Sequence, residues 1–486
     1  MVSQVSQVPS RNTRIAIPIL SLAALAGCAP TIKLAEADRS LPPTYEASAH
    51  SSETTLQLDH WWQGFNDPQL TGLIEQALEH STTARMAYAR IAEARALRNQ
   101  ARAGTLPSGS ISGSASERGS EGLWGAGSDQ SGNQAYQAGF NASWELDIFG
   151  RLGAIRDRAD ADAAVATYDF YGTRMALVAD VANALFLSRY LAVQRVEAED
   201  GLRIARELAR TAAIGQQKGL ISGQDRARLD ADVEANAAEV TRIGAELQNS
   251  VRALLILTGQ ATAPTSSLGI EPRLSTPPAL PDNTPGSLLT RRPDVLSAEA
   301  ALRSATAGVE VSRLALFPQF TIQPGIGLSA IGTPAAGTGL WSLAGGLALP
   351  VLDRPRLMAA LRVSEARGNQ AAIGYERAVQ TAYGDAEKAL VTLSATRQRL
   401  GQLERAEADS RRAFDAARRG YQAGLTDLTT LLQVERTWRQ NRAALHAVRA
   451  GMLTGTVNAI RALGGGWNPV AISAGPPNFP SQPGLP

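Results

Sequence analysis

The single cysteine of the chain, Cys28, is the residue whose chemistry is easiest to infer. Arg11 and Arg14 precede an apolar run from Ile15 to Ala26, and Leu-Ala-Gly stands directly before the cysteine. This order is typical of a bacterial secretion signal that ends in a lipobox. We therefore predict a signal peptide at residues 1–27 and a diacylglyceryl group on the Cys28 sulfur. The alternative is a buried cysteine behind an ordinary signal.

The same segment indicates how the chain meets a membrane. The apolar run is shorter than the roughly 20 residues that a transmembrane helix needs, and we expect no later segment to reach that length. The mature chain should therefore reach the membrane through its lipid, through β-strands, or through both. Ala29 follows the cysteine, where an Asp would resemble a signal for retention in the inner membrane. Ala29 therefore favours the outer membrane.

Glu145 and Asp147 are the best candidates for catalytic carboxylates, because residues two apart in a strand share one face. They lie, however, where a predicted strand gives way to a helix, which favours a structural role. The histidines are scattered without metal-ligand spacing, and the serines lack nearby His and Asp partners. We expect no enzyme activity, no cofactor and no metal site.

The composition favours long, closely packed helices over a large globular core. The chain has 486 residues, of which 19% are charged and 5% aromatic, and it is rich in Ala and Gly. Its net charge of +2 suggests neither nucleic acid nor a store of cations as a partner.

The chain contains two similar halves. The segments at Gly219-Leu220 and Gly424-Leu425 match at an offset of 205 (424 − 219), and Pro107 and Pro318 match at 211 (318 − 107). Six extra residues therefore lie in a Gly/Ser-rich loop of the first copy. Such self-similarity indicates one supersecondary unit used twice. We predict a first repeat at 28–265, a linker at 266–286, a second repeat at 287–466 and an irregular tail at 467–486.

Each repeat should contain helices of unusual length. Two stretches of some 60 residues lack internal proline, and each would span roughly 90 Å as a helix. The predicted helices are 70–103, 152–213 and 222–257 in the first repeat and 287–316, 357–418 and 427–463 in the second.

Alternation of apolar with small or polar residues predicts two strands per repeat. It runs from Tyr136 to Leu146, from Phe320 to Leu328 and from Trp341 to Leu349, with a weaker candidate from Ile111 to Ala115. Such segments of about ten residues are typical of transmembrane barrel strands. Four strands per chain would leave two open edges, which lipid cannot satisfy. Several chains should therefore close one barrel together.

Four motifs follow one another in the order found in a known family. They are Trp61–Pro68, Trp144–Arg151, Arg291–Val295 and Ala462–Trp467. With them the chain resembles, over nearly its whole mature length, the outer-membrane factor family, the TolC- and OprM-like ducts of tripartite efflux pumps and type I secretion. The lipobox favours the lipidated drug-efflux branch (NodT-type outer-membrane efflux lipoproteins).

The resemblance implies an α+β membrane protein that works as a homotrimer. Its twelve-stranded outer-membrane β-barrel, with four strands per chain, would continue as a long antiparallel α-helical barrel across the periplasm. Energy would come from an inner-membrane pump, of the resistance-nodulation-division type, joined to the duct by a periplasmic adaptor (a membrane fusion protein). The family binds no cofactor and no nucleic acid.

The turns between the long and closing helices should lie at the periplasmic tip. Glycine permits the tight reversal. In the family these tips touch the adaptor; the alternative is a turn without contact. The positions that match are Gly219, Leu220, Ile221 and Ser222 in the first repeat and Gly424, Leu425, Thr426 and Asp427 in the second.

The family closes this tip with inward-facing acidic residues and hydrogen bonds. Asp225 matches an acidic gate position and Tyr421 a gate tyrosine, although Asp225 also suits a helix start. Gln433 stands where the family usually has an aspartate, so apolar packing should contribute to closure. Thr430 is the equivalent of Asp225, which makes the tip only pseudo-sixfold. The apolar gate candidates are Leu428, Leu431 and Leu432.

The leading hypothesis is passive conduction of drugs or other small toxic compounds to the outside. The rival within the family is a type I secretion duct. A rival of another class is a lipid-anchored structural spacer, for which we would expect regular heptads and no alternating strands.

Overall fold

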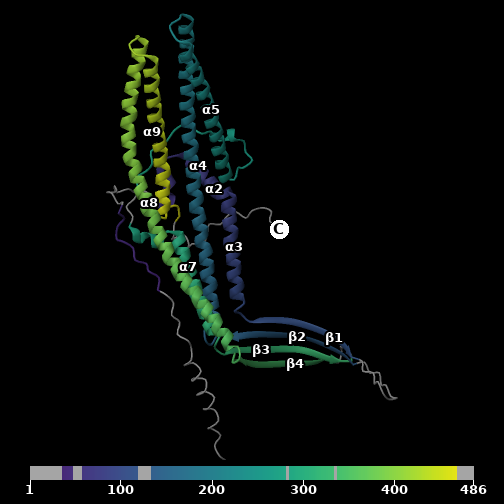
Figure 1. The fold of residues 1–486 in the computed structure, drawn as a ribbon. Coiled ribbons are helices and arrows are strands. Elements are labelled where there is room, and N and C mark those ends of the chain that lie inside the picture. Colours follow the sequence, from purple (N-terminus) through teal and green to yellow (C-terminus); the bar gives the residue numbers. More distant parts are fainter. Residues whose placement is uncertain (1–35, 47–56, 119–132, 281–283, 333–336, 468–486) are drawn as a thin grey trace, which may run out of the picture. The chain divides into compact units, whose positions relative to one another are not determined.

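A computed structural model describes residues 36–46, 57–118, 133–280, 284–332 and 337–467. The chain runs twice through the same series of helices and strands (Figure 1). The first series follows the 3-10 helix η1 (Leu58–Phe65) and consists of α2 (Pro68–His80), α3 (Thr82–Ala103), β1 (Ser108–Arg118), β2 (Asn133–Leu146), α4 (Arg151–Gln217) and α5 (Gly223–Leu257). The second follows the 3-10 helices η2 (Thr265–Ser267) and η3 (Pro285–Ser287) and consists of α6 (Leu288–Arg291), α7 (Pro293–Leu314), β3 (Gln319–Ile331), β4 (Thr338–Ala348), α8 (Arg354–Gln422) and α9 (Leu428–Ala462).

Two compact units divide the chain, and both draw on both series. The first unit contains the sheet and the adjoining helical segments, within residues 94–163 and 300–374. The second contains the remaining helical segments, including all of α5 and α9.

The four strands form one antiparallel sheet in the order β1-β2-β3-β4, which confirms the predicted strands, including the weakest. The register places Ile111, Phe140, Ile326 and Trp341 in one row across the sheet. All four are exposed, with Ile111 at 86% and Trp341 at 83%. The sheet therefore has an apolar face that the described chain does not cover.

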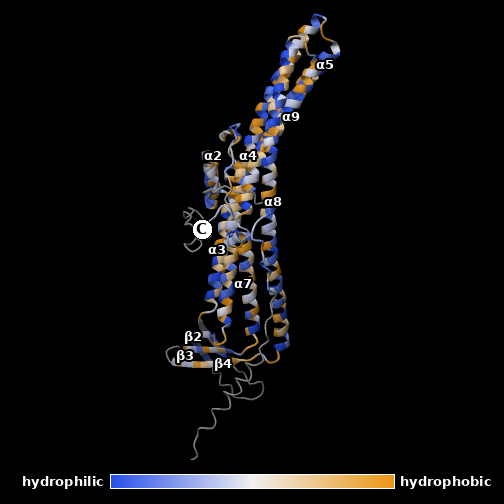
Figure 2. Cartoon of the chain, turned by 90° about the vertical axis from the view of Figure 1, so that its left-hand side faces the viewer, coloured by the Kyte–Doolittle hydropathy of each residue, from blue (hydrophilic) through white to orange (hydrophobic). Residues whose placement is uncertain are grey.

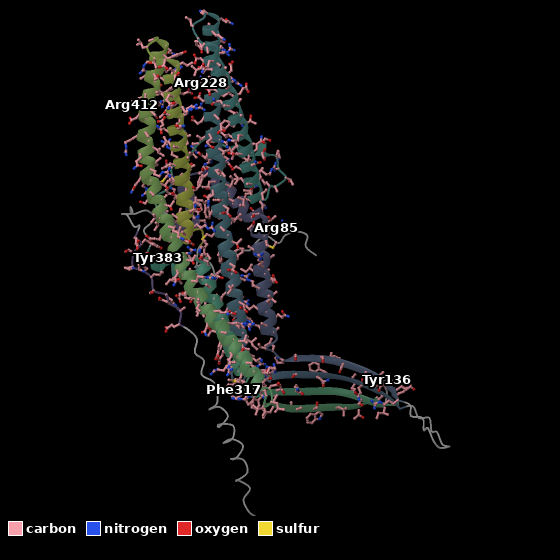
Figure 3. The ribbon with its side chains drawn as sticks, in the orientation of Figure 1. Arg85, Tyr136, Arg228, Phe317, Tyr383 and Arg412 are labelled. Carbon is pink, nitrogen blue, oxygen red and sulfur yellow. The ribbon has the colours of Figure 1, made fainter. Side chains whose placement is uncertain are left out.

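The opposite face of the sheet is polar. Alternation puts Ser110, Ser112 and Ser114 of β1 on it, opposite Asn141, Gly139 and Gln137 of β2. Figure 3 places Tyr136 toward one end of the sheet and Phe317 at the other. β1 and β2 therefore each present one face suited to lipid and one suited to water.

The long helices are longer than the sequence predicted. α4 has 67 residues and α8 has 69. Each therefore rises about 100 Å along its own axis. An 18-residue window of α4 is long and apolar enough to cross a membrane by length and composition, contrary to our expectation. Two thirds of that window is buried within the structure, so its apolar residues serve packing. Figure 2 shows hydrophobic and hydrophilic residues mixed along α4, α5 and α9.

The first predicted helix of each repeat is wrong, because each is broken in two. The first breaks at Ser81, which has a ψ of 136°. The second breaks at Arg292, which has a ψ of 120°. Pro293 follows Arg292, lacks an N–H and forces the preceding residue into extended backbone.

The offset between equivalent elements of the two series becomes smaller along the chain. The offset is 211 (293 − 82) between the starts of α3 and α7, and 205 (428 − 223) between the starts of α5 and α9. The chain ends both closing helices alike: Gly259 and Gly464 have φ of 79° and 78°. An added Cβ would lie 2.6 Å from the oxygen of His80 in the first case and 2.8 Å from that of Arg291 in the second. A glycine is thus required after α5 and after α9, because each of these helices ends in contact with the residue that precedes the break at Ser81 or at Arg292.

A buried ion pair ties α2 to α4 in the second unit. Arg189 and Asp67 are 3% and 2% exposed, and two guanidinium nitrogens contact the carboxylate. Asp67 also accepts the amide of Leu70 and so caps α2, while Arg189 donates to Gln69 at 2.9 Å. Burial alone would raise the pKa of Asp67, but the hydrogen bonds from Arg189 and Leu70 hold it below its ordinary value.

We predict that Arg189→Ala lowers the stability of the protein by about 3–5 kcal/mol, because it leaves the Asp67 carboxylate buried without its partner. The control is Arg195→Ala on the same helix, where the ion pair with Glu199 is half exposed. That change should cost about 0–1 kcal/mol. Unfolding followed by circular dichroism in detergent measures both, and equal losses would contradict the prediction.

Candidate functional site

Within the second unit, glycine-containing turns join α4 to α5 and α8 to α9. We call α4 with α5 the first hairpin and α8 with α9 the second (Figure 1). Gly219 and Gly424 have φ of 71° and 74°. This backbone region costs glycine little. The amide of the next residue donates to the oxygen of Gly215 in the first turn and of Gly420 in the second, both at 2.8 Å. These bonds close the helices as Schellman motifs.

Each tip presents one exposed apolar residue. Leu220 is 77% exposed and Leu425 is 85% exposed. The next residues, Ile221 and Thr426, fold back over a glycine of the preceding turn, where an added Cβ would lie 2.8 Å and 2.4 Å from their side chains. The turns therefore partly cover one side chain of each pair and leave the leucine exposed.

Both closing helices start with a hydroxyl–carboxylate pair, in opposite order. Ser222 caps α5 by accepting the amide of Asp225 at 3.1 Å, and Asp427 caps α9 by accepting the amide of Thr430 at 2.9 Å. In each pair the hydroxyl donates to the carboxylate at 2.7 Å. The hydrogen bonds from Thr430 hold the pKa of Asp427 below its ordinary value. Asp225 thus takes part in the capping of α5, which is the alternative to a gate role that the sequence offered for this residue.

Two gate candidates lie inside the second hairpin. Leu431 is 3% exposed and packs with Phe414 and Trp438, whose rings stack at 4.9 Å. The ring of Tyr421 packs against the same cluster. Within the described part of one chain, Tyr421 and Asp225 form no hydrogen bond with each other.

The other gate candidates lie farther from this cluster. Leu432 and Gln433 line a cavity of about 460 Å³ between α4, α5 and α9. Leu428 is half-buried at the start of α9. The structure therefore distributes the predicted gate residues over different surfaces of the hairpin ends.

Charged residues join α4 to α9 farther along the hairpins, and sequence reasoning missed them. Glu197 accepts a hydrogen bond from Arg442 at 2.5 Å and lies 3.7 Å from His446. Burial alone would raise the pKa of Glu197, but His446 and Arg442 lower it below its ordinary value. Glu435 is almost fully buried, and this burial raises the pKa of its carboxyl.

Glu197, Glu435 and His446 line two cavities. The second cavity, of about 580 Å³, lies between α4, α8 and α9 and shares Glu197, Glu435 and His446 with the first. A comparison of equivalent positions in the two repeats could have pointed to these basic residues. Arg442 and His446 stand where the first repeat has Ala237 and Thr241.

The carboxylates first considered for catalysis have structural partners. Glu145 accepts two hydrogen bonds from the guanidinium of Arg151. Asp147 accepts the amides of Leu152 at 2.9 Å and Gly153 at 2.8 Å, and so caps α4. The pair therefore holds the junction between β2 and α4. Cys28, the predicted lipid site, lies outside the described residues.

We predict that Gly219→Ala and Gly424→Ala each destabilise the protein by about 1–2 kcal/mol, because an L-residue is strained at positive φ. No atom lies within 4 Å of an added Cβ at either position, so strain alone should act. Gly244→Ala in α5 is the control, as its Cβ is equally free but its backbone is helical. This change should instead stabilise by about 0.5–1 kcal/mol, and a loss there would contradict the argument.

Comparison with known proteins agrees with this geometry. A model of the family described as "Outer membrane efflux protein" matches residues 73–260 and 284–466. The pyoverdine export outer membrane protein OpmQ of Pseudomonas putida is 31% identical over 438 residues, which are 88% of this chain and 92% of that protein. The probable outer membrane lipoprotein SilC of Salmonella typhimurium is 28% identical and covers 93% of this chain and 98% of its own.

A solved structure extends the likeness to the fold. The outer-membrane channel OprN superposes with a TM-score of 0.79 at 28% identity, covering 90% of this chain and 99% of that one. The family match spans both series of elements and includes both tips. The chain therefore belongs to the outer membrane efflux protein family, as its motifs indicated, and is an outer-membrane transport protein.

Proposed function

We propose that this chain is the outer-membrane channel of a tripartite efflux pump and passively conducts drugs or other small toxic compounds to the outside. The sheet is the observation that carries the proposal. Its apolar face is exposed, its other face is polar, and no described strand of the same chain pairs with the outer edges of β1 and β4. Such a sheet is suited to a barrel that several chains close together.

Three copies would close the barrel with twelve strands. Closed cyclic symmetry is the usual arrangement of identical chains. In this assembly the polar face of each sheet lines the lumen and the apolar row from Ile111 to Trp341 meets lipid. The helices continue the lumen as an antiparallel α-helical barrel across the periplasm, and the two series along the chain are copies of one unit.

The tips are the proposed contact with a periplasmic adaptor. Exposed Leu220 and Leu425 provide the apolar anchors, and the helix-capping residues around them keep the turns rigid. The remaining contact residues are Gly219, Ile221, Ser222, Gly424, Thr426 and Asp427. An inner-membrane pump, of the resistance-nodulation-division type, would supply the energy, and the lipid on Cys28 would anchor the chain in the outer membrane.

The proposed gate lies just inside these tips. Three Asp225 carboxylates around an axis would repel one another and attract cations. Tyr421 and Gln433 supply hydrogen-bonding groups, and the apolar residues Leu428, Leu431 and Leu432 complete the constriction. Leu431 contributes by holding α8 to α9, because it is buried between them.

Deletion of the gene tests the transport function. We expect greater susceptibility to, and accumulation of, at least one class of small toxic compound, and the restored gene should reverse both. A type I secretion duct would instead lose an exported protein and keep drug susceptibility. A strain unchanged for every compound would contradict the efflux function.

Conductance tests the gate. We predict that Asp225→Ala with Tyr421→Phe increases the single-channel conductance of the purified protein in planar bilayers, because both polar groups leave the constriction. Asp230→Ala, with a half-exposed carboxylate paired to Arg226, is the control on the same helix. Unchanged conductance in the double variant would remove Asp225 and Tyr421 from the gate.

A further inference from the structure

The junction between β4 and α8 carries an exposed apolar segment. Leu352 is 95% exposed and Val351 is 67% exposed. Two arginines on the surface follow at once, Arg354 and Arg356. Apolar side chains next to cations suit a segment at a membrane surface, where the apolar groups enter the hydrocarbon and the cations meet the headgroups.

The equivalent junction of the first repeat, between β2 and α4, has different chemistry. At the offset of 205 (356 − 151), Arg356 corresponds to Arg151, whose guanidinium donates two hydrogen bonds to Glu145. The side chain of Arg151 is 24% exposed, whereas that of Arg356 is 72% exposed. Among the described residues Arg356 pairs only with Asp353, at 3.5 Å. Pro350 occupies the position of Glu145, so the second junction lacks the carboxylate that binds this arginine.

The residue that caps the helix is replaced as well. In the first junction Asp147 accepts the amides of Leu152 and Gly153 and so caps α4. Leu352 stands at the equivalent position (352 − 147 = 205) and has no acceptor group. An almost fully exposed leucine has thus taken the place of a carboxylate that stabilises a helix start. Together with Val351, this leucine indicates a contact outside the chain.

The arginines gain nothing from their own helix. Arg354 forms no ion pair within the described part of the chain. α8 has no acidic residue in its first turn, and cations near a helix N-terminus are unfavourable. An anion from outside the chain would compensate both guanidinium groups.

The apolar surface extends around the same end of the sheet. The register brings the start of β1 and the end of β2 to this end, where Leu106 and Ile148 are exposed. Phe149 packs there against Phe317, with ring centroids 5.0 Å apart (Figure 3 labels Phe317). The segment after β4 therefore continues the apolar face of the sheet.

The length of β4 sets the depth of this segment in a membrane. β4 has 11 residues. At a rise of about 3.3 Å per residue and a tilt of about 40°, it covers about 28 Å of membrane thickness, close to the apolar band of about 25 Å on transmembrane barrels. Val351 and Leu352 follow at the boundary of that band, and Arg354 and Arg356 come next, at the depth of the headgroup phosphates.

A neighbouring copy is a poorer partner for the arginines than a lipid. In the proposed barrel the strand beside β4 would be β1 of the next chain, preceded by α3. Residues 94–116, which include the end of α3 and most of β1, contain no Asp or Glu. The copy would therefore offer no carboxylate to Arg354 or Arg356. A phosphate group suits them, because guanidinium groups bind phosphate oxygens in a bidentate manner.

We propose that the β4–α8 junction binds an anionic phospholipid of the periplasmic leaflet. Leu352 and Val351 lie among the acyl chains, and Arg354 and Arg356 bind the phosphate of the headgroup. The inference rests on the outer-membrane channel proposed above, which sets the orientation of the sheet. Each chain carries one such site, because the β2–α4 junction keeps its carboxylates.

Thermal unfolding of the purified protein in a non-ionic detergent, with increasing phosphatidylglycerol in the micelles, tests the site. A ligand that binds only the folded protein raises the midpoint of unfolding. The lipid concentration that gives half of this rise should increase roughly 10- to 30-fold in Arg354→Gln/Arg356→Gln, because each arginine near an anionic lipid contributes about a factor of five. Leu352→Ser should also increase it.

Arg362→Gln/Arg367→Gln is the matched control. Both arginines are exposed on the same helix, farther from the junction, and neither forms an ion pair among the described residues. This variant removes the same charge and should leave the lipid response unchanged. An equal loss in the control, or the same rise with inorganic phosphate in place of the lipid, would overturn the site.

Two further readouts separate the site from its alternatives. If Leu352→Ser abolishes detergent-resistant trimers on unheated gels but keeps the lipid response, a neighbouring copy covers the junction and the lipid site is wrong. A wild-type protein that forms no pore in planar bilayers would overturn the proposed channel. A pore-forming protein whose lipid response survives Arg354→Gln/Arg356→Gln would overturn the lipid site alone.

Discussion

The outer edges of β1 and β4 carry backbone N–H and C=O groups that no described strand of the same chain pairs. Within lipid each unpaired group costs several kcal/mol, because no water replaces the missing partner. The exposed row of Ile111, Phe140, Ile326 and Trp341 makes water an equally poor environment for this sheet. The proposed pairing of copies edge to edge would satisfy these groups and complete the sheet. This constraint favours closure of one barrel by several copies, and the proposed number of three comes from the resemblance to the family.

The helical part meets a different physical problem. Helices of 67 and 69 residues cannot share one central core, so packing is divided among local clusters. Polar ties supplement these clusters where specificity matters: the Arg189–Asp67 pair fixes α2 on α4, and Asp147 fixes the start of α4 after β2. Such ties select one arrangement, since a buried charge without its partner is costly.

The two series of elements share a backbone but differ in chemistry. Glycines with positive φ recur at equivalent places, and the caps Ser222 and Asp427 occupy equivalent positions. The side chains between the hairpins do not repeat. The first repeat has Glu234 where the second has Arg439, and the second has Ala406 where the first has Gly201.

Local rules explain what could be predicted from the sequence alone. Alternation predicted β1 to β4 because the side-chain period of a strand is two, and Gly219 and Gly424 predicted the reversals because few other residues tolerate positive φ. The breaks at Ser81 and Arg292 were missed, since apolar periodicity continues across both. The contacts of Glu197, Asn236 and Arg439 join residues up to 245 positions apart. Only the tertiary structure decided them, because the crossing of α9 over Gly201 depends on how two hairpins pack and not on any pattern within one helix.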